Sequence, residues 1–371
     1  MWNLSKNRFL KTVSRCYTTS KSSVSDKKTE EVTKLVAMEK FKQKAVSVSV
    51  LGVDNPSGEY LSFLLKQNPL VSHLYLVGEK APGIAADLDS MDTRTMICGY
   101  TDHDVEKAVK KSEIVILMGL EKQRDQEATP EAQFHREYER VIRLARICTM
   151  YASKSIIYVC VNPVSYMVPL VSAIYKKTHW YHPGRIIGSV AVHQVKLNSL
   201  LADYYKLDPA GINVPVCGGP DLDCLVPIFS RATPLATTSP DEVLLIKKYR
   251  NVGETGDVLK PIKSFKHDSE SMAKAFAINR SITAIALGLL GDQNSNMVGH
   301  IRSNIFQTSS YLTSTLQVGR GGVVHNYGVP VLSRTELLLL EQALLLMYER
   351  EQLAICALEG VDEKKVVKMT S

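Results

Sequence analysis

The sequence predicts an α/β protein with a doubly wound parallel sheet and a second, C-terminal α/β (α+β) domain. Two observations favour the parallel sheet: several short strands are apolar throughout, and they alternate with helices. A third is the stretch "VSVSVLGVDNPSGEYLSFLLK" at 46–66, in which an apolar strand runs through a glycine-containing turn into a helix. The chain has 371 residues, of which 45% are hydrophobic, so it is long enough for two domains.

The first half of the chain supplies the alternating elements, with strands expected at 46–51, 73–77, 113–118 and 155–161 and helices at 58–67, 84–91 and 131–152. In the second half, we expect a helix after Gly188 that ends near 205, a strand at 212–219, and helices at 239–256, 269–291 and 334–359. The pattern changes near 188–190, which places the domains at 46–188 and 189–360. Residues 21–45 are then a linker and 361–371 a tail.

The N-terminal segment has a composition of its own. Residues 1–25 contain no acid but five basic residues: Lys6, Arg8, Lys11, Arg15 and Lys21. A helix would place three of these on one face, and serine and threonine are plentiful, which is typical of a mitochondrial transit peptide over residues 1–20. A disordered basic tail is the alternative. Residues 1–20 carry four of these five basic residues. Without residues 1–20 the net charge falls from +7 to 7 − 4 = +3, which does not suggest a nucleic-acid partner.

Two further classes are disfavoured by composition. No apolar run reaches the roughly 18 residues of a membrane helix, so we expect no membrane span. The seven cysteines are scattered, odd in number and without a CxxC pair, which indicates free thiols and no metal site.

The turn at 52–58 has part of a dinucleotide-binding pattern. Gly52 and Gly58 provide the first and last glycines, which allow the tight turn and the close packing of helix on strand. Asn55 and Pro56 occupy the middle, where bulk increases and one backbone N–H is lost. The acid expected at the end of the next strand is replaced by Gly78, with Glu79 one residue later as a candidate ribose ligand.

Several longer segments resemble mitochondrial-type malate dehydrogenases. "LLKQNPLVSHLYLV", "PGIAADLDSMDTRTMICGY", "VNPV", "KLDPAGINVPVCGG" and "VPIFS" occur in the family's order and spacing, over about 46–360. The resemblance implies a Rossmann domain, a substrate domain, the cofactor NAD, and the oxidation of malate to oxaloacetate in the tricarboxylic acid cycle. It also implies a homodimer, or a heterodimer with an active homologue. Gly119 and Asn162 match positions that contact cofactor and substrate.

The positions that carry the family's proton transfer have changed. The catalytic histidine of the family follows a Gly-Gly pair, and here Pro220 follows Gly219. The aspartate that orients it is replaced by His193. A substrate arginine becomes Lys196, which keeps the charge but loses the bidentate geometry.

The loop after the 113–118 strand normally carries two more arginines. Lys122 aligns with the first, the second falls on Pro130, and Arg124 could substitute for one of them. An asparagine expected on the following helix is replaced by Glu137, which would repel a dicarboxylate. Lys122, Arg124, Asn162 and Lys196 are therefore the remaining candidates for binding an anion.

Two functions compete on these observations. The first is a malate dehydrogenase-like protein without catalysis, structural or regulatory in role. The second is an active NAD-dependent malate or 2-hydroxy-acid dehydrogenase with a rearranged dyad, in which His193 is the base and Asp221 orients it. The resemblance implies NAD, but Asn55, Pro56 and Gly78 argue against its binding.

Overall fold

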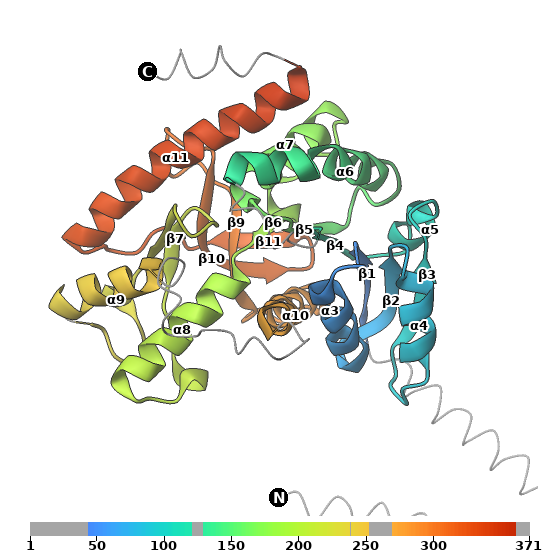
Figure 1. Ribbon diagram of the computed structural model, residues 1–371, viewed down its shortest axis with the longest axis horizontal. Helices are drawn as coiled ribbons and strands as arrows, with labels where there is room; N and C mark the ends of the chain where they lie inside the picture. The colour runs from blue at the N-terminus through green and yellow to red at the C-terminus, as the bar shows by residue number, and fades with distance from the viewer. Residues whose placement is uncertain (1–43, 121–128, 238, 252–268, 361–371) are drawn as a thin grey trace, which may run out of the picture. The chain divides into compact units, whose positions relative to one another are not determined.

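The computed structural model describes residues 44–120, 129–237, 239–251 and 269–360, and the residues from Ala45 onward belong to one compact unit. The predicted transit peptide and tail lie outside the described residues, as does the predicted linker except for its last two residues, 44 and 45. Within them the chain forms an 11-stranded sheet in the order β3-β2-β1-β4-β5-β6-β9-β10-β7-β8, with β11 paired to β10. Figure 1 shows the strands between two sets of helices.

Six parallel strands make up the first part of the sheet: β1 (Val46–Leu51), β2 (Val71–Val77), β3 (Met96–Tyr100), β4 (Ile114–Met118), β5 (Ile156–Cys160) and β6 (Ile186–Ser189). The order 3-2-1-4-5-6 is that of a Rossmann sheet, so the predicted fold class is confirmed. Helices connect them: α3 (Pro56–Gln67), α4 (Ala81–Asp89), α5 (Val105–Val109), α6 (Pro130–Tyr151), α7 (Val164–Lys177) and the short η1 (Pro183–Arg185).

The second part of the sheet is antiparallel: β7 (Val216–Gly218), β8 (Leu225–Pro227), β9 (Asn296–Arg302), β10 (Tyr311–Gly319) and β11 (Gly322–Asn326). Its helices are α8 (Ala191–Tyr205), η2 (Pro209–Gly211), η3 (Phe229–Arg231), α9 (Ser239–Asn251), α10 (Ser269–Leu290) and α11 (Arg334–Glu359). β6 joins the two parts, because it pairs in parallel with β5 and antiparallel with β9. The expected boundary at 188/189 therefore falls inside a strand.

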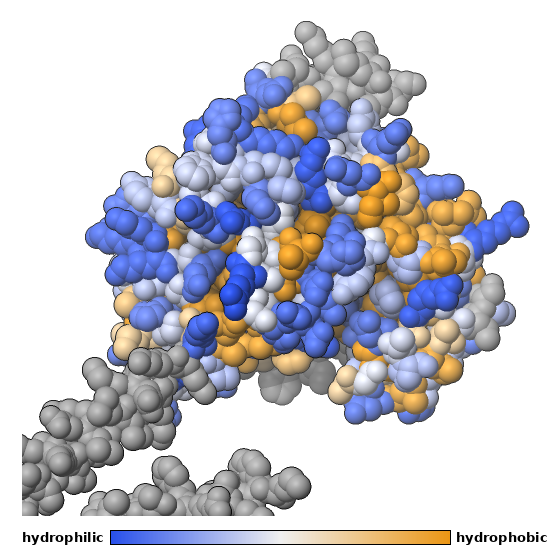
Figure 2. All heavy atoms as spheres, turned by 180° about the vertical axis from the view of Figure 1, so that it is seen from behind, coloured by the Kyte–Doolittle hydropathy of each residue, from blue (hydrophilic) through white to orange (hydrophobic). Residues whose placement is uncertain are grey.

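The apolar core lies on both faces of the sheet. One cluster joins β4 and β5 to α6, α7 and the end of α11, and the other joins β1 and β2 to α3 and α10. α10 is long and apolar enough to cross a membrane, the one such helix among the described residues. It packs against α3, α8 and β10, as the core helix of a globular unit does. Hydrophobic side chains are interspersed with hydrophilic ones on the face shown in Figure 2.

Candidate functional site

The glycine-containing turn lies where the strand order reverses, at the carboxyl ends of β1 and β4, which is where such sheets bind ligands. Gly52 has φ +96°, which favours glycine, and it begins the turn. A Cβ on Gly58 would lie 2.8 Å from the Cα of Val53, so only glycine lets α3 pack this closely. Both glycines thus have a structural role that does not require a cofactor.

The side chain of Asn55 caps α3. Its Oδ1 accepts a hydrogen bond from the backbone N–H of Gly58 at 2.6 Å, and its Nδ2 donates to the carbonyl oxygen of Gly119. Pro56 is the first residue of the helix, where its missing N–H does no harm. Helix α3 therefore begins with one of its free N–H groups already bonded to a side chain, and the turn is tied to the end of β4.

Asp54 connects the turn to the end of β2. Its carboxylate accepts hydrogen bonds from the backbone N–H groups of Glu79 (3.2 Å) and Lys80 (2.8 Å). A Cβ on Gly78 would lie 2.6 Å from Asp54 Oδ2, so no side chain fits at position 78 while Asp54 keeps this place. The predicted ribose ligand Glu79 is exposed and donates its backbone N–H to Asp54, an acid that the sequence analysis did not single out.

Arg140 and Glu137 lie at the carboxyl ends of β1 and β4. Glu137 is only 2% exposed; its carboxylate accepts from the N–H of Leu120 and pairs with Arg140 Nε at 3.2 Å. Arg140 Nη2 donates to the Met118 carbonyl, and its Nη1 lies 3.1 Å from where a Cβ of Gly52 would be. From the sequence, we expected this carboxylate to repel a dicarboxylate substrate. It faces Arg140, because a buried carboxylate needs a partner.

These contacts test whether the turn fits a dinucleotide. A pyrophosphate needs backbone N–H groups that point at it and room for it above the middle of the turn. Here Pro56 has no N–H, the N–H of Gly58 is bonded to the Asn55 side chain, and the Arg140 guanidinium lies against Gly52 and the Met118 carbonyl. The described residues do not fit the group in this arrangement.

The second region lies at the end of β7, where the family keeps its base. Pro220 is buried there and has no proton to transfer. His193 is on α8, partly buried, and its Nδ1 lies 2.7 Å from the hydroxyl of Tyr249 on α9. Burial, and then the charge of Lys196, lower the pKa of His193 to about 4, although the charge of Asp223 opposes them. The imidazole is therefore neutral at physiological pH, and Lys196 itself is exposed.

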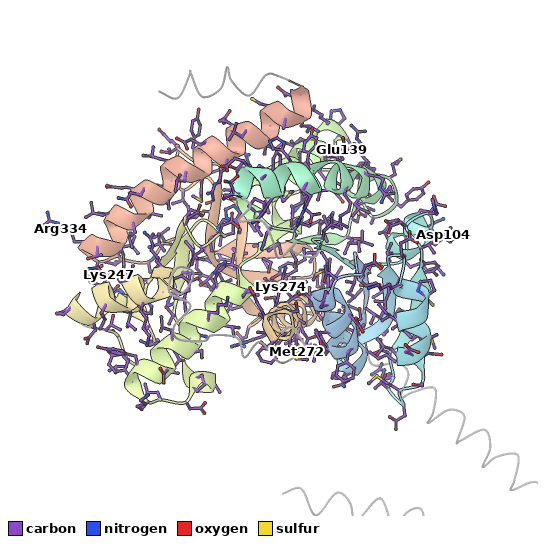
Figure 3. All side chains as sticks on the ribbon, viewed as in Figure 1. Asp104, Glu139, Lys247, Met272, Lys274 and Arg334 are labelled. Carbon is purple, nitrogen blue, oxygen red and sulfur yellow. The ribbon has the colours of Figure 1, made fainter. Side chains whose placement is uncertain are left out.

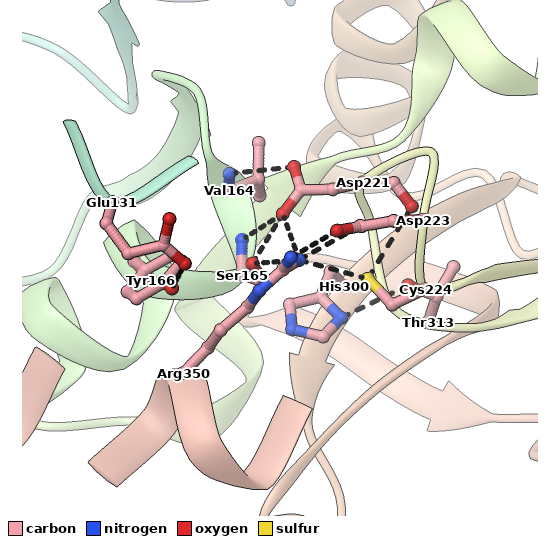
Figure 4. Close-up of polar contacts among 10 residues, drawn as sticks. All are labelled: Glu131, Val164, Ser165, Tyr166, Asp221, Asp223, Cys224, His300, Thr313 and Arg350. Carbon is pink, nitrogen blue, oxygen red and sulfur yellow. Dashed lines mark hydrogen bonds and ion pairs between the residues drawn. The ribbon is translucent and has the colours of Figure 1, made fainter. Parts of the chain in front are cut away.

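The dyad of His193 and Asp221 is not formed. Asp221 accepts hydrogen bonds from the backbone N–H groups of Val164 (3.0 Å) and Ser165 (3.1 Å) and from the Ser165 hydroxyl, at the start of α7 (Figure 4). It also lies 3.6 Å from Arg350 Nη1. Burial raises the pKa of Asp221, while Ser165 and Arg350 counteract the shift. The carboxylate caps a helix, because the first N–H groups of α7 lack partners within the helix.

Arg350 is the centre of this region, although nothing in its local sequence marks it. It extends from α11 and donates to both carboxylate oxygens of Asp223, with its Nη1 at 3.0 Å from Oδ1 (Figure 4). Burial alone would raise the pKa of Asp223, but the hydrogen bond and charge of Arg350 hold it below the ordinary value. The guanidinium also lies 5.5 Å from the centre of the Tyr166 ring, whose hydroxyl donates to Glu131.

The remaining predicted residues do not join this cluster. Asn162 is exposed, directly before a cis peptide bond to Pro163. Lys122 and Arg124 lie outside the described residues, and Pro130 is the first residue of α6. Among the described residues no group of three or more His, Cys, Asp and Glu could hold a metal ion, and the six cysteines there are free.

Comparisons with known proteins agree with the fold. Residues 46–188 match the family model for the NAD binding domain of lactate/malate dehydrogenase. The chain is 27% identical over 303 residues to the mitochondrial malate dehydrogenase of Felis catus, covering 81% of this chain and 88% of that protein. It is 28% identical over 295 residues to that of Homo sapiens, covering 79% and 86%.

Solved structures show the same fold. The malate dehydrogenase of Plasmodium falciparum superposes with a TM-score of 0.67 at 20% identity, covering 84% of this chain and 98% of that one. The lactate dehydrogenase of Eimeria maxima, solved with NADH and oxamate, gives a TM-score of 0.69 at 16% identity, covering 86% and 96%. At these identities the likeness concerns the fold alone.

Proposed function

Because the chain belongs to the lactate/malate dehydrogenase family, we propose that it is a malate dehydrogenase-like protein that has lost the dehydrogenase reaction and acts as a structural or regulatory relative. One observation carries the proposal: the polar groups at the end of β7 bond to one another and leave no base. Pro220 cannot accept a proton, and Asp221 and Asp223 are held by Arg350. The role does not require NAD to be bound.

The size of the loss follows from the chemistry of hydride transfer. A positioned base contributes about 10²–10⁴-fold to such a rate, and groups that act as a unit are lost together. The full-length protein should show no oxaloacetate-dependent oxidation of NADH above the rate of a heat-denatured sample. Turnover at even a hundredth of the rate of an active malate dehydrogenase, measured in parallel, would overturn the proposal.

The alternative of an active enzyme with a rearranged dyad predicts a different outcome. It requires His193 to exchange a proton near neutral pH, whereas burial holds its pKa at about 4 and its Nδ1 faces Tyr249. If turnover were found, His193→Ala would abolish it on this alternative and leave it unchanged otherwise.

We also propose that the protein pairs with a second copy or with an active homologue. The neighbouring helices α3 and α10 expose three large apolar side chains, Phe63 (43%), Met272 (42%) and Phe276 (54%). Figure 3 marks Met272 on α10. Exposed apolar patches of this kind are typical of interfaces. In sedimentation experiments, the wild type should have the mass of a dimer and the Phe276→Glu variant that of a monomer. A monomeric wild type would refute self-pairing.

The proposed location is the mitochondrion. It is supported by the basic, acid-free composition of residues 1–20 and by relatives named as mitochondrial. A fluorescent fusion of the full chain should enter mitochondria, and a fusion that begins at residue 21 should not.

A further inference from the structure

We propose that this chain closes its own nucleotide cleft: Asp54, Asn55 and Arg140 make the contacts between strand ends that a bound dinucleotide would make in a dehydrogenase. The closure is distinct from the loss of catalysis, because an inactive relative could still bind NADH. It concerns the carboxyl ends of β1, β2 and β4, whereas the loss of catalysis concerns the end of β7.

The contact between β1 and β2 depends on Asp54. An acid at the end of β2 normally holds a ribose hydroxyl of the cofactor, which lies across the ends of both strands. Here Asp54 comes from the turn after β1 and reaches the N–H groups of Glu79 and Lys80 directly. Since a side chain at position 78 would meet Asp54 Oδ2 at 2.6 Å, the internal acid and a ribose-binding acid exclude each other.

The contact between β1 and β4 depends on Asn55 and Arg140. Asn55 Nδ2 donates to the carbonyl of Gly119, and Arg140 Nη2 donates to the carbonyl of Met118, so both carbonyls at the end of β4 face side chains of this chain. Glu137 holds Arg140 in place from one helical turn away. All these partners are buried or partly buried, which makes an unpaired group costly and the closed arrangement stable.

Charge and space both oppose a dinucleotide here. The carboxylate of Asp54 adds a negative charge at the end of β2, and the charge of Arg140 is already neutralised by Glu137. Entry of the ligand would break the bonds of Asn55 and displace the Arg140 guanidinium from Gly52. The free energy needed to break these internal contacts would therefore lower the affinity for the cofactor.

The test is a gain of binding in the full-length chain. The opened variant carries Asp54→Ala, Asn55→Gly, Glu137→Ala and Arg140→Ala, and NADH binding is measured by titration calorimetry. We expect no binding by the wild type at roughly 1 mM NADH. In the opened variant we expect a dissociation constant at least tenfold below that concentration. Tight binding by the wild type, or a folded opened variant that binds no better, would overturn the closure.

A matched control uses the same helix and spacing. Arg136 and Glu139 are exposed on α6, and Glu139 is labelled in Figure 3. The double variant Arg136→Ala/Glu139→Ala removes one charge of each sign without touching the turn, so its NADH affinity should equal that of the wild type. If the affinity of this control for NADH increased as much as that of the opened variant, any change of charge on α6 would have the same effect, which would count against the proposal.

A second measurement does not depend on the folding of the opened variant. In the wild type without nucleotide, the amide protons of Glu79 and Lys80 should exchange slowly with solvent, because Asp54 accepts both. Asp54→Ala should accelerate both by at least tenfold and leave the amides of β5 unchanged. Rapid exchange in the wild type would show that Asp54 does not bridge the strand ends.

Discussion

Arg350 is the residue on which the region at the end of β7 depends. It is 6% exposed and pairs with two carboxylates on the β7–β8 turn, one of which caps α7. Arg350→Met should destabilise the protein by about 3–5 kcal/mol, because removal of one partner leaves buried charge uncompensated. Urea denaturation measures the change.

Substitution of Asp223, which pairs with Arg350, should have a smaller effect on stability than substitution of Arg350. The side chain of Asp223 is 46% exposed, so water can replace part of its lost partner. Asp223→Asn should therefore cost only about 1 kcal/mol. Equal costs for the two variants would contradict the geometry described for Arg350.

The buried histidines predict how stability depends on pH. Burial lowers the pKa of His300 to about 3 and that of His193 to about 4, both below the unfolded value near 6.5. The unfolded chain therefore binds more protons below pH 6.5, and the free energy of unfolding falls as the pH drops from 6.5 toward 4.

The contribution of His193 to this pH dependence of stability can be measured separately. Each histidine should contribute about 1.4 kcal/mol per pH unit in this window. His193→Gln keeps a side chain that can hydrogen-bond Tyr249 but does not titrate. Between pH 7 and pH 5, the urea midpoint of this variant should therefore decrease less than that of the wild type. A variant with the same pH dependence as the wild type would mean that His193 titrates normally.

At the level of residues, the sequence predicted what was missing but not what replaced it. Pro220 and Gly78 are visible as departures from a pattern of fixed spacing. Arg350 and Arg140 are not, because their partners come from elsewhere in the chain: 127 residues separate Arg350 from Asp223. Asp54 was overlooked because the acid was expected on the strand after it.

Helix α3 begins this close to the turn after β1 only because Gly58 has no side chain. An added Cβ would meet the Val53 Cα at 2.8 Å and the Gly52 carbonyl oxygen at 2.9 Å, and both are backbone atoms that cannot turn aside. Gly58→Ala should thus destabilise the protein by about 1–3 kcal/mol, as overpacking does. Thermal denaturation measures the loss.

Gly83 is the matched control for this element. It lies inside α4, where a Cβ would meet nothing within 4 Å. Gly83→Ala should leave stability unchanged or increase it by about 0.4–1 kcal/mol, since alanine restricts the unfolded chain. If both substitutions had the same effect, the close approach of α3 to β1 would not be the reason for Gly58.

The elements that the sequence predicted are those with plain patterns. Strand β1 and helix α11 have the predicted bounds, 46–51 and 334–359. Strand β10 was missed because "YLTSTLQVG" contains polar residues that are nevertheless buried: Thr313 pairs with His300, and Ser314 with Asn326. Such residues look exposed in a sequence until their partners are known.

The sheet as a whole does not follow the division expected at 188/189. That boundary was placed by a change of composition, yet β6 continues the sheet into β9 through the pairs Gly188–His300 and Ser189–Gly299. The core beneath β1 contains Ile278 and Ile282 of α10 as well as Val48. A local pattern cannot reveal this, because the contacts join residues more than 100 positions apart.

The shared core predicts that the two halves of the chain unfold together. A fragment of residues 46–188 lacks α10 and β9. It would therefore expose the apolar side chains of β1 and α3 that α10 covers, and the edge of β6 that pairs with β9. We expect one cooperative urea transition for the full chain and for a trimmed chain of residues 44–360, and none for the fragment. Circular dichroism at matched concentrations distinguishes the cases. Cooperative unfolding of the fragment would mean that the dinucleotide-type half folds alone, and that α10 adds to a core that is already complete.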